Sequence, residues 1–317
     1  MIISILLILV GFSGLIFGAN FLVDGSASLA KKNNIPDLII GLTIVAFGTS
    51  APELVVNSVA SYNGLSDIVL ANIIGSNNFN LFFILGIAAL IYPIAVQSST
   101  ARREIPLSLI IAVLSLGLAT EFFMTQNSEI SRFDGLILLL FFFAFLYFLF
   151  SKMKSEKTET VAYVPKSNFK IWSSILIGFL GLIVGGKLVV DYSINVATEL
   201  GVSQKIIGLT IISIGTSLPE LVTSIVAATK KNSDIAIGNV IGSNIFNLLF
   251  ILSISSLINP IQYNQEFNRD FALLIGGTLF LIIALVFSKR KKIEKWKALI
   301  LVSFYLFYTS FLVMKEL

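Results

Sequence analysis

The stretch GLTIISIGTSLPELVTSIVAATKKNSDIAIGNVIGSNIFNLLFILSISSLINP, residues 208–260, decides how the chain is organised. It contains two motifs in which polar and small residues interrupt apolar runs. These motifs are GTSLPE, from Gly215 to Glu220, and GNVIGSNIFN, from Gly238 to Asn247.

Nearly the same stretch occurs earlier in the chain, with GTSAPE from Gly48 to Glu53 and ANIIGSNNFN from Ala71 to Asn80. At a constant offset of 167 residues, 34 of 56 positions are identical between residues 39–94 and 206–261. The chain is therefore a duplicated unit, and both copies keep their polar residues.

The composition indicates a polytopic membrane protein. Of the 317 residues, 56% are hydrophobic and 13% are charged, with a mean hydropathy of +0.92. These values exclude an ordinary soluble domain. The chain has no cysteine and no histidine, so disulfides, thiol catalysis and histidine metal sites are excluded. The net charge of +4 is explained by membrane topology, and no nucleic-acid partner is expected.

Apolar runs of about 20 residues, the length that crosses a bilayer, recur along the chain. We expect ten transmembrane helices, the first of them retained and not removed as a signal peptide. Their approximate ranges are 2–23, 35–61, 68–94, 105–123, 133–150, 171–190, 206–229, 235–258, 271–287 and 296–314. The predicted units are a first repeat over residues 1–151, a polar linker over 152–170 and a second repeat over 171–317.

Because five helices is an odd number, the two repeats must enter the membrane from opposite sides, as two inverted five-helix repeats. Basic residues support this topology: the expected loops place 17 of them on one side and four on the other. The four are Arg132, Lys205, Arg269 and Lys315. By the positive-inside rule, linker 152–170 is cytoplasmic and both termini lie outside the plasma (inner) membrane.

Glu53 and Glu220 each lie near the middle of an apolar span. A charge at that depth costs ~2.5–3.5 kcal/mol on insertion scales, so an unpaired pair of carboxylates would be a severe burden. Neither motif has a lysine or arginine at comparable depth. The simplest counter-charge is a metal ion, and two carboxylates match one divalent cation.

Helical spacing places further oxygen donors beside these carboxylates. Each repeat has two polar stripes at intervals of about four residues. The stripes are Thr49, Ser50, Glu53 and Asn57; Thr216, Ser217, Glu220 and Ser224; Asn72, Ser76 and Asn80; and Asn239, Ser243 and Asn247. Oxygen ligands are those that calcium and sodium require, with calcium taking 6–8 of them.

Prolines add backbone oxygens to this set. Pro52 and Pro219 lack an N–H and crowd the carbonyls of Gly48 and Gly215, so both helices are expected to break there. A lone serine, threonine or proline in a membrane helix is more often structural than functional. A repeated carboxylate in the membrane core is functional by default, and this difference favours an ion site.

The two motifs, GTSxPE followed by GNxxGSNxxN and present twice, resemble the alpha repeats of the sodium/calcium exchanger family, within the calcium/cation antiporter superfamily. The resemblance implies a ten-helix exchanger with Glu53 and Glu220 as the central ion ligands. It also implies ligands in both repeats: Thr49, Ser50, Ser76, Asn80, Thr216, Ser217, Ser243, Asn247 and the backbone carbonyls of Ala46 and Ser213. The first and sixth spans would be the helices that slide past the rest.

The chain departs from the family pattern at Ala71, Asn78 and Ser213. Asn80 and Asn247 are both amides, whereas some family members have an aspartate at one of these positions. The predicted site therefore has two acidic ligands, which is enough for one calcium ion.

We expect a secondary active antiporter that exchanges Na⁺ for Ca²⁺, not an enzyme. No cofactor and no protein partner are expected beyond the lipid bilayer, and the functional unit is expected to be a monomer. One alternative is a proton-coupled antiporter for calcium or another cation, because glutamates can carry protons. A second alternative is a cation channel, because the same oxygen ring can select ions without coupling.

Overall fold

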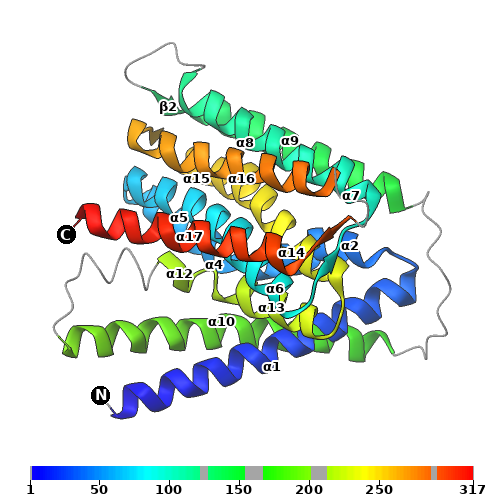
Figure 1. Cartoon of the computed structure of the whole chain (residues 1–317). Helices are drawn as coiled ribbons and strands as arrows, with labels where there is room; N and C mark the ends of the chain where they lie inside the picture. Colours follow the sequence, from blue (N-terminus) through cyan, green and yellow to red (C-terminus); the bar gives the residue numbers. More distant parts are fainter. Residues whose placement is uncertain (1, 122–127, 154–166, 201–212, 287–290, 317) are drawn as a thin grey trace.

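The computed structural model describes residues 2–121, 128–153, 167–200, 213–286 and 291–316 as a bundle of long helices (Figure 1). Six helices in this part of the chain are long and apolar enough to cross a membrane. A bent pair, Asp37–Thr49 and Ala51–Tyr62, would make a seventh span. The helical membrane fold expected from the composition is therefore confirmed.

The first half contains helices at each position where the sequence predicts a span. They are α1 (Ile2–Asn33), α2 (Asp37–Ile40), η1 (Gly41–Val45), α3 (Ala46–Thr49), α4 (Ala51–Tyr62), α5 (Ser66–Asn78), η2 (Phe79–Ile84), α6 (Leu85–Ile91), α7 (Ser98–Arg102), α8 (Glu104–Ala119) and α9 (Arg132–Met153). Helix α1 extends ten residues past the predicted end at Val23, because its last turns pack inside the protein.

The second half repeats the pattern. Its helices are α10 (Asn168–Glu199), α12 (Ser213–Gly215), α13 (Leu218–Thr229), α14 (Ser233–Phe246), η5 (Asn247–Ile251), α15 (Leu252–Ile258), η6 (Gln265–Phe267), α16 (Asn268–Val286) and α17 (Lys295–Glu316). The first part of the predicted span 206–229 and most of the linker 152–170 lie outside the described residues.

Helices α1 and α10 pack against each other along their length, at one side of the bundle (Figure 1). Glycines make the approach possible. A Cβ atom on Gly18 would lie 2.8 Å from the carbonyl oxygen of Gly178, and one on Gly185 would lie 2.7 Å from that of Gly11. Small residues at such spacing allow close contact between membrane helices.

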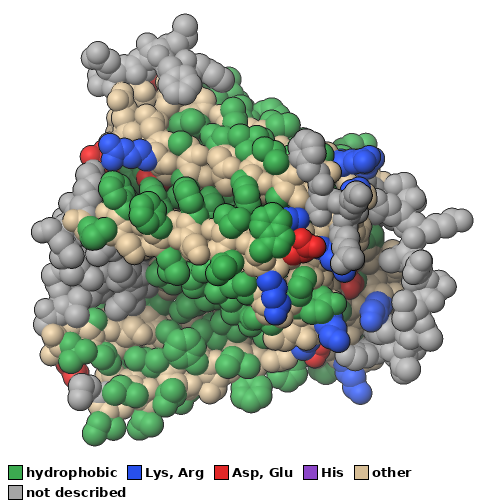
Figure 2. All heavy atoms as spheres, in the orientation of Figure 1, with side chains coloured by type: hydrophobic (Ala, Val, Ile, Leu, Met, Phe, Trp, Pro, Cys, Tyr) green, Lys and Arg blue, Asp and Glu red, His purple; other side chains and the backbone are tan. Residues whose placement is uncertain are grey.

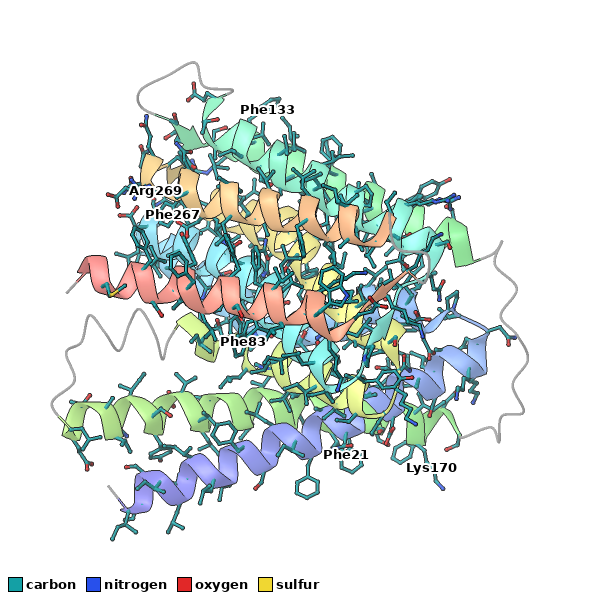
Figure 3. All side chains as sticks on the ribbon, viewed as in Figure 1. Phe21, Phe83, Phe133, Lys170, Phe267 and Arg269 are labelled. Atoms are coloured by element: carbon teal, nitrogen blue, oxygen red, sulfur yellow. The ribbon has the colours of Figure 1, made fainter. Side chains whose placement is uncertain are left out.

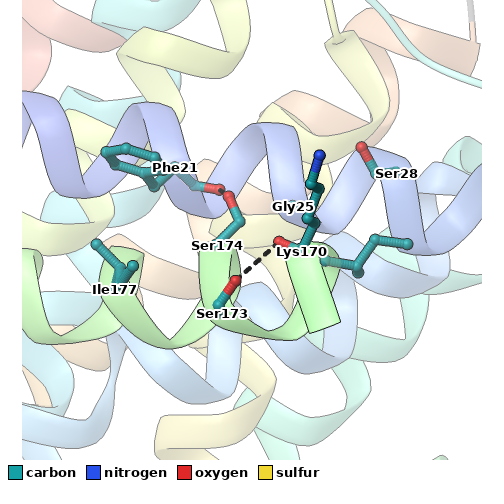
Figure 4. Close-up of a pocket in the computed structure, with 8 residues that line it drawn as sticks. Phe21, Gly25, Ser28, Lys170, Ser173, Ser174 and Ile177 are labelled. Carbon is teal, nitrogen blue, oxygen red and sulfur yellow. Dashed lines mark hydrogen bonds between the residues drawn. The ribbon is translucent and has the colours of Figure 1, made fainter. Parts of the chain in front are cut away.

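A pocket of about 240 Å³ lies at one end of this helix pair (Figure 4). The hydroxyls that line it are bound to backbone carbonyls: Ser173 Oγ donates to Lys170 O at 3.2 Å, and Ser174 Oγ donates to Phe21 O at 2.9 Å. Ser173 is hydrogen-bonded within its own helix, as expected for a lone serine in a membrane helix, whereas the Ser174 hydroxyl joins α10 to α1.

Both motif helices are interrupted just before their prolines. Ser50 (φ −84°, ψ 7°) separates α3 from α4, and the segment Asp37–Thr49 is bent by 48° relative to Ala51–Tyr62. Ser217 (φ −90°, ψ 8°) occupies the same place before α13, with Pro219 in the first turn. Proline is tolerated at a helix start because the N–H it lacks would have no partner there. The predicted breaks at Pro52 and Pro219 are confirmed.

The helices that carry the second motif of each repeat form the centre of the bundle. Along α5–α6 and α14–α15 most residues are buried, and each contains a π-helical turn, η2 or η5, beginning at or beside the last asparagine of the motif. Such turns widen the backbone and often lie at functional sites. Asn80 lies in η2, and Asn247 opens η5.

Two short antiparallel ladders, absent from the all-helical prediction, join the repeats. β1 (Ile94–Ala95) pairs with β4 (Lys292–Ile293), and β2 (Glu129–Ile130) pairs with β3 (Ile261–Gln262). Pro93 and Pro260 explain them: a residue before proline is forced into extended backbone, which ends α6 and α15 and leads into a strand.

The surface matches a membrane-spanning body. Apolar side chains cover the middle of the face in Figure 2, and lysine and arginine side chains gather mainly at its right-hand end. Figure 3 places Lys170 at that end and Arg269 at the opposite end. Exposed apolar residues such as Phe133 and Leu140 (70% and 69% exposed) would be unfavourable in water, so this band indicates contact with lipid.

Candidate ion-binding site

The two motif carboxylates lie at the centre of the bundle, each bound by a serine of the other repeat. Ser50 Oγ donates to Glu220 Oε1 at 2.8 Å, and Ser217 Oγ donates to Glu53 Oε1 at 2.9 Å. Each glutamate is only 1% exposed. Because the helix break turns both serines towards the opposite repeat, the two repeats complete a single site.

Amides and threonines form a second layer around the carboxylates. Thr49 Oγ1 lies 3.0 Å from Asn239 Oδ1, and the equivalent contact joins Asn72 Nδ2 to Thr216 Oγ1 at 3.2 Å. Asn239 Nδ2 also donates to the backbone carbonyl of Glu220 at 3.2 Å. Asn72 and Asn239 therefore tie the motif helix of one repeat to that of the other.

Asn57 and Ser224 complete this layer. Asn57 Nδ2 donates to Asn72 Oδ1 at 2.7 Å, and Asn239 Nδ2 donates to Ser224 Oγ at 3.0 Å. Both residues lie on the helix faces predicted for them, one turn beyond the carboxylate. Their contacts hold the amides of the second layer in place.

Asn80 and Asn247 are held by their nitrogen atoms. Asn80 Nδ2 donates to Asn244 Oδ1 at 3.1 Å, and Asn247 Nδ2 donates to Asn77 Oδ1 at 3.0 Å and to Ser76 Oγ at 3.0 Å. With the nitrogen atoms fixed, the side-chain oxygens of Asn80 and Asn247 are left as acceptors.

Asn77 and Asn244 were not among the predicted site residues, although both lie inside the repeated GSNxxN motif. Asn77 Nδ2 donates to Asn244 O at 3.4 Å, and Asn244 Nδ2 donates to Asn77 O at 3.2 Å. Their exact repetition in both copies was the available signal. They lie outside the polar stripes because they are offset by one position from Ser76 and Ser243.

Several oxygens at this centre have no hydrogen-bond partner within the described residues. They are Glu53 Oε2, Glu220 Oε2, Asn80 Oδ1, Asn247 Oδ1 and Ser243 Oγ. A buried polar atom without a partner is costly, and a buried carboxylate oxygen more so. Four of the five form equivalent pairs from the two repeats. This donor set, two carboxylates with neutral oxygens, suits a hard cation.

The other residues predicted as ligands, Ala46, Ser76 and Ser213, do not supply any of these five oxygens. The carbonyl of Ala46 accepts hydrogen bonds from Ser50 N at 3.0 Å and Thr49 Oγ1 at 3.3 Å. Ser76 Oγ donates to Ile73 O at 3.1 Å, and only the backbone of Ser213, at the start of α12, is described. Among the described residues, no three acidic side chains lie close enough to share an ion.

Glycines bring the neighbouring helices up to the site. A Cβ atom on Gly242 would lie 2.8 Å from Leu42 Cα, so α14 packs directly against the backbone of η1. Gly48 and Gly215, just before the breaks, leave room for side chains of α10. A Cβ atom on Gly48 would overlap the ring of Phe179, and one on Gly215 would lie 2.3 Å from Val190 Cγ2. Helix α10 therefore contacts both breaks.

Comparisons with known proteins identify the family of the chain. The family model for "sodium/calcium exchanger protein" matches residues 3–151 and 170–314. Sodium/calcium exchanger MaX1 of Methanosarcina acetivorans is 30% identical over 346 residues, covering 98% of this chain and 98% of that protein. Inner membrane protein YrbG of Escherichia coli is 34% identical over 301 residues, covering 91% of this chain and 88% of that protein.

Solved structures of a sodium-calcium exchanger are also similar to this chain. A structure of the sodium-calcium exchanger NCX_Mj, soaked with Na⁺ and Sr²⁺, aligns with a TM-score of 0.84 at 30% identity. The alignment covers 98% of each chain. With the family model spanning both repeats, these matches show that the chain belongs to the sodium/calcium exchanger family.

Proposed function

We propose that this protein is a secondary active antiporter that exchanges Na⁺ for Ca²⁺ at a site between Glu53 and Glu220. One observation carries the proposal: two buried carboxylates, one from each repeat, each have one oxygen bound by a serine of the other repeat and one without a partner in the described part of the chain. A divalent cation would neutralise both charges.

The ion ligands would come from both repeats. Besides the two carboxylates, Asn80, Asn247 and Ser243 supply oxygens without other partners among the described residues. Thr49, Ser50, Ser76, Thr216 and Ser217, with the carbonyls of Ala46 and Ser213, would complete sodium sites that overlap the calcium site. Because one set of carboxylates cannot hold both ions at full occupancy, a sodium gradient can drive calcium across by alternating access.

The membrane arrangement is part of the proposal. Ten spans would form two inverted repeats, over residues 1–151 and 171–317, joined by the linker 152–170. The gathering of basic side chains at the Lys170 end supports a cytoplasmic linker and outward termini. Helices α1 and α10 would move together as the gate, since they pack mainly on each other and α10 contacts both helix breaks.

The test is radioactive calcium uptake into proteoliposomes loaded with sodium, compared with vesicles that carry only a pH gradient. We expect sodium-driven uptake. Removing a charged contact worth about 3 kcal/mol, by Glu53→Gln or Glu220→Gln, should reduce uptake by roughly 100-fold. Glu266→Gln, at an exposed position outside the bundle core, is the matched control and should transport normally.

Each contrary result has a distinct meaning. Robust sodium-driven uptake in both glutamine variants would refute the carboxylate site. Uptake driven only by the pH gradient would identify a proton-coupled antiporter that uses the same fold. Single-channel currents in a planar bilayer would identify a channel.

A further inference from the structure

A groove on the outside of the bundle lies between α8 and α9, away from the carboxylates. Its volume is about 380 Å³, and its walls include Ile110 of α8 and Phe141 and Phe145 of α9. Leu249 of η5 forms part of its lining, and Arg102 and Arg103 line one end. The groove is therefore apolar along its length and basic at one end.

Both arginines are exposed, and neither contacts a carboxylate in the part of the chain that the structure describes. They lie at the end of α7 and just before α8, where the chain enters the apolar region. Ile110 lies seven residues after Arg103, which is about 10 Å along a helix axis. A molecule that fits must have an anionic head and an apolar tail at least that long.

The second repeat contains an equivalent groove, which serves as an internal comparison. It has a volume of about 230 Å³ between α16 and α17, and its lining includes Phe82 of η2. Phe82 and Leu249 are equivalent at the offset of 167 residues. The two grooves are therefore equivalent by the repeat, so differences between them identify what is particular to each.

Charge is the main difference. At the same offset, Arg102 and Arg103 correspond to Arg269 and Asp270, so two positive charges in the first repeat correspond to a base and an acid in the second. Asp270 Oδ1 also accepts a hydrogen bond from Tyr308 Oη at 2.5 Å, and neither Arg269 nor Asp270 lines the second groove. Only the first groove is suited to an anionic headgroup.

We propose that the groove between α8 and α9 is a binding site for an anionic phospholipid. Its phosphate would lie against Arg102 and Arg103, and an acyl chain would lie along Ile110 and Phe141. Basic pockets between membrane helices on the cytoplasmic side are suited to such headgroups. Because Leu249 is two residues after Asn247, the bound chain would contact the π-helical turn that holds an oxygen of the central site.

The experiment is native mass spectrometry of the delipidated full chain titrated with phosphatidylglycerol, and with phosphatidylcholine of the same acyl chains. We expect one phosphatidylglycerol to be retained in preference to phosphatidylcholine. The double variant Arg102→Gln, Arg103→Gln should weaken this binding by roughly 30-fold. Ala144→Leu, which fills the groove and keeps both charges, should weaken it as well.

Two control variants test the location. Gly276→Leu fills the equivalent groove, where an added Cβ meets nothing within 4 Å, and Arg269→Gln removes an arginine at the other end. Neither should change phosphatidylglycerol binding. Equal retention of both lipids, unchanged binding in Ala144→Leu, or equally tight binding of soluble glycerol phosphate would overturn the proposal. This measurement does not depend on ion exchange.

Discussion

The two repeats differ in how they hold their last motif asparagine, and this difference predicts unequal effects of two equivalent substitutions. Asn247 Nδ2 has two acceptors, Asn77 Oδ1 and Ser76 Oγ, each at 3.0 Å. The structure gives Asn80 Nδ2 one acceptor, Asn244 Oδ1 at 3.1 Å. Repeat symmetry alone predicts that Asn77→Ala and Asn244→Ala have the same effect.

The contacts predict otherwise. Each substitution removes the hydrogen bond from the deleted amide to a backbone carbonyl of the other repeat, so this loss cancels in the comparison. Asn77→Ala leaves Asn247 bound to Ser76, so the further loss is that of one interhelical hydrogen bond, about 0.6 kcal/mol or roughly 3-fold in calcium affinity. Asn244→Ala leaves Asn80 without that acceptor. An orphaned buried donor costs about 1–3 kcal/mol, or roughly 5- to 150-fold. Asn80 can then rotate, and its oxygen no longer stays directed at the ion.

The assay is calcium binding by titration calorimetry on detergent-purified protein, with thermal melting as the control for folding. Both variants should melt as cooperatively as the parent protein, and Asn244→Ala should have clearly the weaker calcium affinity. Equal affinities in two folded variants, or a greater loss in Asn77→Ala, would refute the positioning argument.

Three further predictions follow from single contacts. Gly242→Ala should lower the melting temperature markedly, because the added Cβ meets backbone at 2.8 Å, whereas Gly276→Ala, with open space around it, should melt like the parent. Arg132→Gln should lower the melting temperature by a few degrees, because the Arg132 guanidinium donates to two carbonyls at the end of α15, at 3.1 and 3.2 Å. An unchanged melting temperature would show that these two hydrogen bonds are dispensable. Ser217→Ala removes the 2.9 Å hydrogen bond to Glu53 and should weaken calcium uptake by roughly 10-fold, measured as the half-saturating concentration; parent-like uptake would contradict the shared site.

Much of this protein could be predicted from its sequence because the membrane limits the possible folds. Long apolar runs must be helical in lipid, and a carboxylate such as Glu53 in such a run requires a partner. The duplication then indicated that Glu220 has the same role, and proline marked where each motif helix breaks. Family membership followed from these same motifs.

The contacts between repeats were decided by the tertiary structure. The stripe of residues around Glu53 shows which side chains share a helix face, but not that Ser217, 164 residues away, donates to that carboxylate. Asn77 and Asn244 were missed for the same reason: their function lies in their partners on the other repeat. Helical periodicity fixes positions around one helix, whereas the orientation of an amide depends on neighbours that only the packed bundle supplies.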